Sequence, residues 1–103
     1  MPASDSVLLR APGPGPMYDG HFPGQPMLPG ARLLDLVLAA LGVDRVEVST
    51  LKFLLPVGPS TPLRLDWRRD DTGRIDFECL LVGEAAAAAT PARLVAAGKL
   101  RPL

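Results

Sequence analysis

One stretch of the chain, residues 20–41, constrains the fold more than any other. It reads GHFPGQPMLPGARLLDLVLAAL, a loop dense in proline and glycine followed by a segment that is almost entirely apolar. Prolines fix φ and remove backbone donors, while glycines permit sharp turns, so the first half predicts a stiff loop. A side chain at the start of this loop, such as that of the only histidine, His21, can be held firmly.

The second half of the stretch predicts a helix over about residues 30–41. Pro29 suits the start of a helix, and Gly42 suits the position just after its last turn. The leucines and valine between them leave almost no polar face, which is typical of a helix that is buried on all sides. In a chain of 103 residues we expect this helix to lie inside a curled sheet and partly against a second subunit.

The remaining sequence predicts a sheet around this helix. Alternating apolar and polar side chains between turn-forming residues define candidate strands at residues 6–11, 43–55, 63–69, 74–82 and 92–101. Residues 70–73 have the composition of a hairpin turn, residues 11–20 hold too many prolines for regular structure, and residues 84–90 are ambiguous between helix and strand end. We expect an α+β fold, one domain over residues 1–103, in which an antiparallel sheet wraps one buried helix.

Composition excludes several classes of function. The net charge is zero, so we expect no nucleic-acid partner, and no apolar run approaches the ~20 residues that span a bilayer. The N-terminus lacks the pattern of a signal peptide, and a lone Cys79 forms no intrachain disulfide, so we expect a cytoplasmic protein. With one histidine and a cysteine distant in sequence, we expect neither a metal nor a cofactor.

Three groups near the helix start are candidates for chemistry. His21 titrates near neutrality and can accept a proton, although this observation alone favours a merely structural histidine. Asp35 lies in the middle of an apolar helix, where a carboxylate is costly unless it is paired, hydrogen-bonded or protonated. Burial would favour its neutral form, a proton donor, and an i,i+3 ion pair with Arg32 is an equally good interpretation.

The third candidate is the backbone at Gly30. Free N–H groups at a helix start can hold a developing oxyanion, and glycine would permit close approach of a carbonyl. A base, an acid and an oxyanion donor together suit elimination β to a thioester carbonyl.

These residues carry a resemblance to a known family. Residues 21–30, HFPGQPMLPG, followed by LLD at 33–35, resemble the active-site signature of the hot-dog-fold 3-hydroxyacyl-[acyl-carrier-protein] dehydratases. Residues 52–57 and 98–100 resemble later strands of that family more weakly. The compact length and the LPG…LLD pattern resemble the small dehydratases of aryl-polyene and related pigment clusters.

The resemblance implies a hot-dog fold and dehydration of 3-hydroxyacyl thioesters to trans-2-enoyl thioesters in fatty acid, polyketide or aryl-polyene-type synthesis. It implies that His21 is the base, that Asp35 is the acid, and that the Gly30 amide polarises the thioester carbonyl, with Phe22 also assigned to oxyanion or substrate binding. It further implies that acyl carrier protein is the partner and that the site forms across a homodimer.

Two alternatives stay open at this point. One is thioester hydrolysis on the same fold, in which a helix carboxylate activates water. The other is a non-catalytic module that binds pantetheine or serves as a dimer partner. Release of a free thiol would distinguish the first, and carrier binding without turnover the second.

Overall fold

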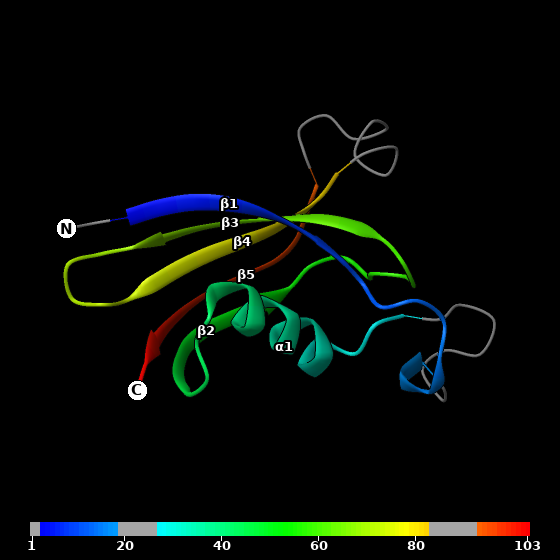
Figure 1. Ribbon diagram of the computed structural model, residues 1–103, viewed down its shortest axis with the longest axis horizontal. Helices are drawn as coiled ribbons and strands as arrows, with labels where there is room; N and C mark the ends of the chain where they lie inside the picture. The colour runs from blue at the N-terminus through cyan, green and yellow to red at the C-terminus, as the bar shows by residue number, and fades with distance from the viewer. Residues whose placement is uncertain (1–2, 19–26, 83–92) are drawn as a thin grey trace.

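The computed structural model describes residues 3–18, 27–82 and 93–103. Its elements are β1 (Ala3–Arg10), the 3-10 turn η1 (Pro16–Tyr18), α1 (Gly30–Leu41), β2 (Val46–Phe53), β3 (Pro62–Arg69), β4 (Ile75–Leu81) and β5 (Leu94–Pro102). The strands form one antiparallel sheet in the order β1-β3-β4-β5-β2, and α1 lies against one face of it (Figure 1). The expected α+β architecture, an antiparallel sheet with one helix, is confirmed.

The predicted ends of α1 are also confirmed. The carbonyl of Pro29 accepts the first intrahelical bonds, from the N–H groups of residues 32 and 33. Gly42 follows the last turn with φ 70°, a left-handed conformation that glycine adopts at little cost. Its N–H donates to Ala39 O and that of Val43 donates to Leu38 O, both at 3.1 Å, which satisfies carbonyls that the helix leaves open.

Alternation along the central strands places their apolar side chains on the face that carries α1. Leu63 and Leu65 of β3 are buried, as are Ile75, Phe77 and Cys79 of β4. These side chains form one core cluster with the buried side of α1. The alternation that marked residues 63–69 and 74–82 as strands therefore places their apolar side chains in the core.

The turn predicted at residues 70–73 joins β3 to β4. Gly73 has φ 90°, and its N–H donates to the carbonyl of Asp70 at 3.1 Å. The Asp70 carboxylate accepts from the hydroxyl of Thr72 at 2.6 Å and from the N–H groups of Thr72 and Arg74. These hydrogen bonds, the Thr72 hydroxyl first, lower the pKa of Asp70.

Several strand ends differ from expectation; β2, for example, spans Val46–Phe53 rather than residues 43–55. β1 begins at Ala3 rather than at residue 6, because all of its residues pair with β3. The segment at 11–20, expected to lack regular structure, contains the short turn η1, which begins at Pro16, where a proline's missing donor costs nothing. The ambiguous residues 84–90 lie outside the described residues.

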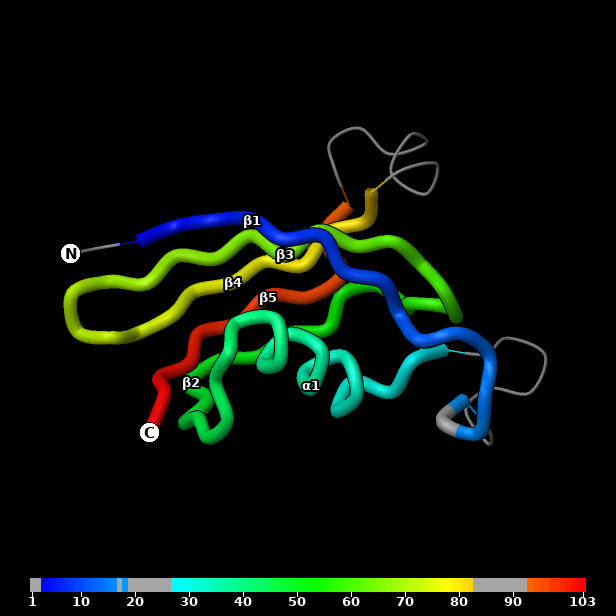
Figure 2. Tube along the Cα trace, in the orientation of Figure 1, coloured from blue at the N-terminus to red at the C-terminus, as the bar shows by residue number. Residues whose placement is uncertain are grey.

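The expectation that α1 is buried on all sides is wrong for the single chain. Only Leu33 and Val37, one turn apart, are buried, because a single sheet covers one side of a helix. Arg32 and Asp35 are exposed, and Leu34 is half-buried. The trace in Figure 2 shows α1 with the sheet on one side only. No helix in the described part of the chain has the length and apolar character needed to span a bilayer.

Candidate active site at the start of the helix

An open, mainly apolar pocket of about 360 Å³ lies beside the first turn of α1. Its walls come from the start of the helix and from the segment at 53–57, which follows β2. Residues 27 and 28, which come just before Pro29 and the helix, complete the pocket. Pockets that bind acyl chains and other small molecules are typically apolar with a few polar groups at one end. Gly30 lines this pocket, and the first turn of a helix has N–H groups without intrahelical partners.

Gly30 is needed here because of a close contact. A Cβ added to Gly30 would lie 2.8 Å from Cε2 of Phe53, closer than side-chain carbons approach in proteins. Phe53, at the end of β2, is 49% exposed and lines the pocket. The sequence pattern points to Gly30 but not to Phe53. The apolar residues at 53–55, which interrupt the alternation of a strand end, were the available signal.

The loop between β2 and β3 holds the chain at two points around His21. Before the His21 motif, the N–H of Ala11 donates to Thr61 O at 2.9 Å. Within the second half of the motif, the N–H of Leu28 donates to Val57 O at 2.7 Å. This loop therefore supports both the segment that leads to the motif and the part of the motif next to the helix.

Tyr18 adds a second restraint before the motif. Its side chain is buried, and its hydroxyl donates to the carbonyl of Pro12 at 2.6 Å. The same carbonyl accepts the N–H of Ser60 at 3.0 Å. Burial raises the pKa of Tyr18, which keeps the phenol a hydrogen-bond donor.

His21 and Phe22 lie outside the described residues, within 19–26. Their roles as base and as a substrate-binding residue, and the approach of His21 to Asp35, stay predictions. The oxyanion role of the Gly30 amide also stays a prediction.

Asp35 is placed differently from expectation. Its side chain is 67% exposed, and its Oδ2 lies 3.7 Å from Nη1 of Arg32. The single chain therefore does not bury this carboxylate, and the alternative ion pair is present. Exposed pairs at this helical spacing contribute only about 0.3–0.5 kcal/mol, so the pair does not hold Asp35 firmly.

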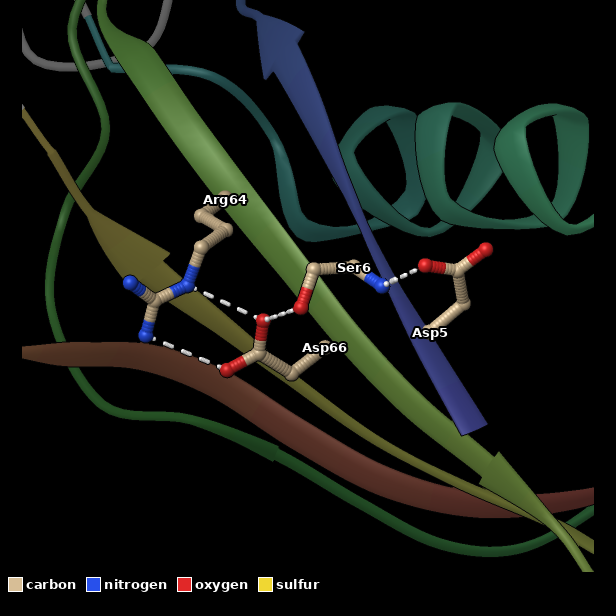
Figure 3. A network of polar contacts seen from close by, with 4 residues as sticks. All are labelled: Asp5, Ser6, Arg64 and Asp66. Carbon is tan, nitrogen blue, oxygen red and sulfur yellow. Dashed lines mark hydrogen bonds and ion pairs between the residues drawn. The ribbon is translucent and has the colours of Figure 1, made fainter. Parts of the chain in front are cut away.

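A second, more polar pocket of about 390 Å³ lies against β1, β3 and β4, and none of its residues belongs to the motif. Next to it, Asp66 accepts from the hydroxyl of Ser6 at 2.7 Å and from Nε of Arg64 at 2.9 Å (Figure 3). The Ser6 bond, together with Arg64, lowers the pKa of Asp66. The Ser6 bond joins β1 to β3, and the Arg64 bond lies within β3, so these polar groups stabilise an exposed sheet face.

Comparison with known proteins places the chain in a family. A family model described as ApeI-like, ApeI dehydratase, matches residues 6–90 and so includes the whole motif. The 3-hydroxyacyl-[acyl-carrier-protein] dehydratase FabZ of Zymomonas mobilis is 32% identical over 66 residues, 50% of this chain and 42% of that protein. FabZ of Granulibacter bethesdensis is 30% identical over 97 residues, 70% of this chain and 56% of that protein. The chain thus spans about half the length of these relatives.

Solved structures confirm the fold. An uncharacterized protein from Erwinia carotovora subsp. atroseptica has a TM-score of 0.74 at 24% identity, covering 99% of this chain and 86% of that one. The dehydratase heterocomplex ApeI:P from Xenorhabdus doucetiae has a TM-score of 0.68 at 23% identity, covering 95% and 85%. The helix-on-sheet architecture is accordingly the hot-dog fold, and the matched motif region identifies this chain as a member of the ApeI-like dehydratase family.

Proposed function

We propose that this protein dehydrates 3-hydroxyacyl thioesters carried on acyl carrier protein to trans-2-enoyl thioesters. The observation that carries the proposal is the apolar pocket at Gly30, at the start of the helix that bears Asp35. The pocket suits an acyl thioester, and the family match supports the reaction. Fatty acid, polyketide or aryl-polyene-type synthesis supplies substrates of this class.

In the proposed reaction His21 takes the proton from C2 of the substrate. The electron pair of that C–H bond forms the C2–C3 double bond as the C3–O bond breaks, and the hydroxyl leaves as water with a proton from Asp35. The Gly30 N–H stabilises the negative charge that develops on the thioester oxygen, as donors at a helix start can do. No other reactant is needed for the atoms and charges to balance.

A second subunit is part of this proposal. Asp35 is exposed in the single chain, whereas an acid that protonates a leaving hydroxyl works best out of bulk water. A partner that covers the open side of α1 would provide that environment, with His21 of one subunit serving Asp35 of the other. The protein is proposed to work in the cytoplasm, where its one cysteine, the buried Cys79, is a free thiol.

The test uses purified protein with 3-hydroxyacyl carrier proteins of several chain lengths and detects the enoyl product by mass spectrometry. We expect His21→Ala to abolish turnover and Asp35→Asn to lower kcat by roughly 10²–10⁴-fold, the usual contribution of a general acid. Asp44→Asn, an exposed aspartate just after α1, is the matched control and keeps full activity. Full activity of Asp35→Asn, with folding verified by circular dichroism, would refute the assigned acid.

One observation favours a second candidate, a non-catalytic partner subunit. Asp35 is exposed and paired with Arg32, as expected of a carboxylate that takes no part in chemistry. Carrier-protein binding without enoyl product, unchanged by His21→Ala, would select this candidate. Release of free thiol from a substrate whose hydroxyl is intact would instead indicate thioester hydrolysis.

A further inference from the structure

We propose that Phe53 is a specificity-determining residue, whose ring discriminates against acyl thioesters that carry a substituent at C2, the carbon next to the thioester carbonyl. The feature that carries this role is the position of the ring, which lies against the backbone of Gly30 and also lines the apolar pocket. This selectivity rests on the proposed function for one point only, the binding of the thioester oxygen at the Gly30 N–H.

The ring lies on the same side of Gly30 as an oxygen bound to its N–H. A Cβ built on Gly30 would be 2.8 Å from Cε2 and 2.9 Å from Cζ of Phe53. A Cβ lies about 2.5 Å from the nitrogen of its own residue, so the ring comes within roughly 5.3 Å of the Gly30 nitrogen. In a helix the N–H and the Cα–Cβ bond both point toward the N-terminus. An oxygen that accepts from this N–H, about 2.9 Å from the nitrogen, is therefore a close neighbour of the ring.

The pocket determines which part of a thioester meets the ring. Its walls are mainly apolar, and they include Phe53 together with residues 27–28 and 54–57. The acyl chain is the apolar part of the substrate, so burial favours placing the chain in the pocket and the polar carrier arm toward solvent. C2 joins the carbonyl carbon to this chain. With the oxygen at Gly30, C2 therefore lies beside the Phe53 ring.

Little space is open at this point, and the backbone behind the ring is fixed. The three atoms nearest to a Cβ on Gly30 all belong to Phe53, at 2.8–3.2 Å, so the gap between them does not hold even one methyl group. Phe53 pairs with Ala96 of β5, and the N–H of the next residue, Leu54, donates to Val95 O at 2.8 Å. The ring therefore makes room only by rotating its side chain, which its 49% exposure permits in part.

These contacts set the class of substrate and the size of the discrimination. A C2 that carries two hydrogens fits beside the ring edge, whereas a 2-methyl group adds one carbon on the side that the ring occupies. One carbon more or less in an apolar site changes kcat/KM by roughly 10–200-fold. Because the Phe53 ring is half-exposed and can rotate, we expect the lower end of this range, a preference of roughly ten-fold for substrates unsubstituted at C2.

Turnover of matched substrates tests this role. The full chain is assayed with 3-hydroxyhexanoyl carrier protein and with both C2 epimers of the 2-methyl-3-hydroxyhexanoyl form. The wild type should show a kcat/KM roughly ten-fold or more in favour of the unbranched substrate. Phe53→Leu, and Phe53→Met as a second variant without the ring, should bring the two values within about three-fold of each other. Leu54→Ala, the matched control, shortens the neighbouring pocket residue and should keep the wild-type ratio.

Binding separates this role from the proposed reaction. Hexanoyl-pantetheine and 2-methylhexanoyl-pantetheine lack the 3-hydroxyl group and cannot be dehydrated, so calorimetric titration gives their Kd values without turnover. We expect the wild type to prefer the unbranched thioester and Phe53→Leu to lose that preference. If no enoyl product forms but this binding preference depends on the ring, the proposed reaction alone fails. Equal use or binding of both forms by the wild type, a folded ring-free variant that keeps the full preference, or neither binding nor turnover of any of these thioesters would overturn the role of Phe53.

Discussion

The contact between Gly30 and Phe53 makes a prediction that can be worked from distances. In Gly30→Ala the new methyl group would lie 2.8 Å from Cε2, 2.9 Å from Cζ and 3.2 Å from Cδ2 of the Phe53 ring. Overpacking of this kind costs about 1–3 kcal/mol, and the higher propensity of alanine, which applies to helix interiors, returns little at the first residue of α1. Because the ring is half-exposed it can move aside, so we expect the lower end of this cost, a loss of roughly 1 kcal/mol.

Gly98→Ala provides the comparison. Its Cβ would lie 2.8 Å from Cε1 of Phe77 and 2.8 Å from the carbonyl oxygen of Thr50. Phe77 is buried and the Thr50 oxygen belongs to the backbone, so neither can move aside cheaply. We expect this variant to lose about 3 kcal/mol or more, or to fail to fold.

Thermal unfolding at one fixed protein concentration measures both changes. A loss of 1 kcal/mol lowers Tm by roughly 4–8 °C in a domain of this size. The control is Gly30→Ala in a Phe53→Leu background, where the ring is gone and the substitution should cost nothing. If Gly30→Ala lowers Tm equally in both backgrounds, or does not lower it at all, the contact does not explain the glycine.

Two further predictions concern polar contacts. Tyr18→Phe removes the 2.6 Å hydrogen bond to Pro12 O, but the N–H of Ser60 still satisfies that carbonyl. We therefore expect the free energy of unfolding to fall by only about 0.5–1 kcal/mol, measured by urea titration. An unchanged urea midpoint would contradict this prediction. In the folded chain the pKa of Asp66 is lowered from 3.8, first by the hydrogen bond from the Ser6 hydroxyl. The ionised Asp66 carboxylate therefore stabilises the fold above pH 3.8, and this contribution is lost as the pH falls through the lowered pKa. Stability measured from pH 6 to about pH 2 should therefore fall less in Asp66→Asn than in the wild type, and parallel curves would exclude the linkage.

Local chemistry made much of the fold predictable from the sequence. Pro29 and Gly42 delimit α1, because one suits the first turn and the other adopts the left-handed conformation that closes the last. The turn at 70–73 followed from the ability of Asp70 to accept backbone bonds and of Gly73 to take positive φ. The motif at 21–35 likewise pointed to the family, because its residue types and spacing are visible without coordinates.

The tertiary structure decided what depends on distant pairing. An almost uniformly apolar helix does not reveal which side meets the sheet, so the exposure of Asp35 and its pair with Arg32 required coordinates. The ring of Phe53 reaches Gly30 only because β2 ends beside the helix start. The pairing of β2 with β5 carries a register shift between Val48 and Thr50, and alternation along a single strand does not show it.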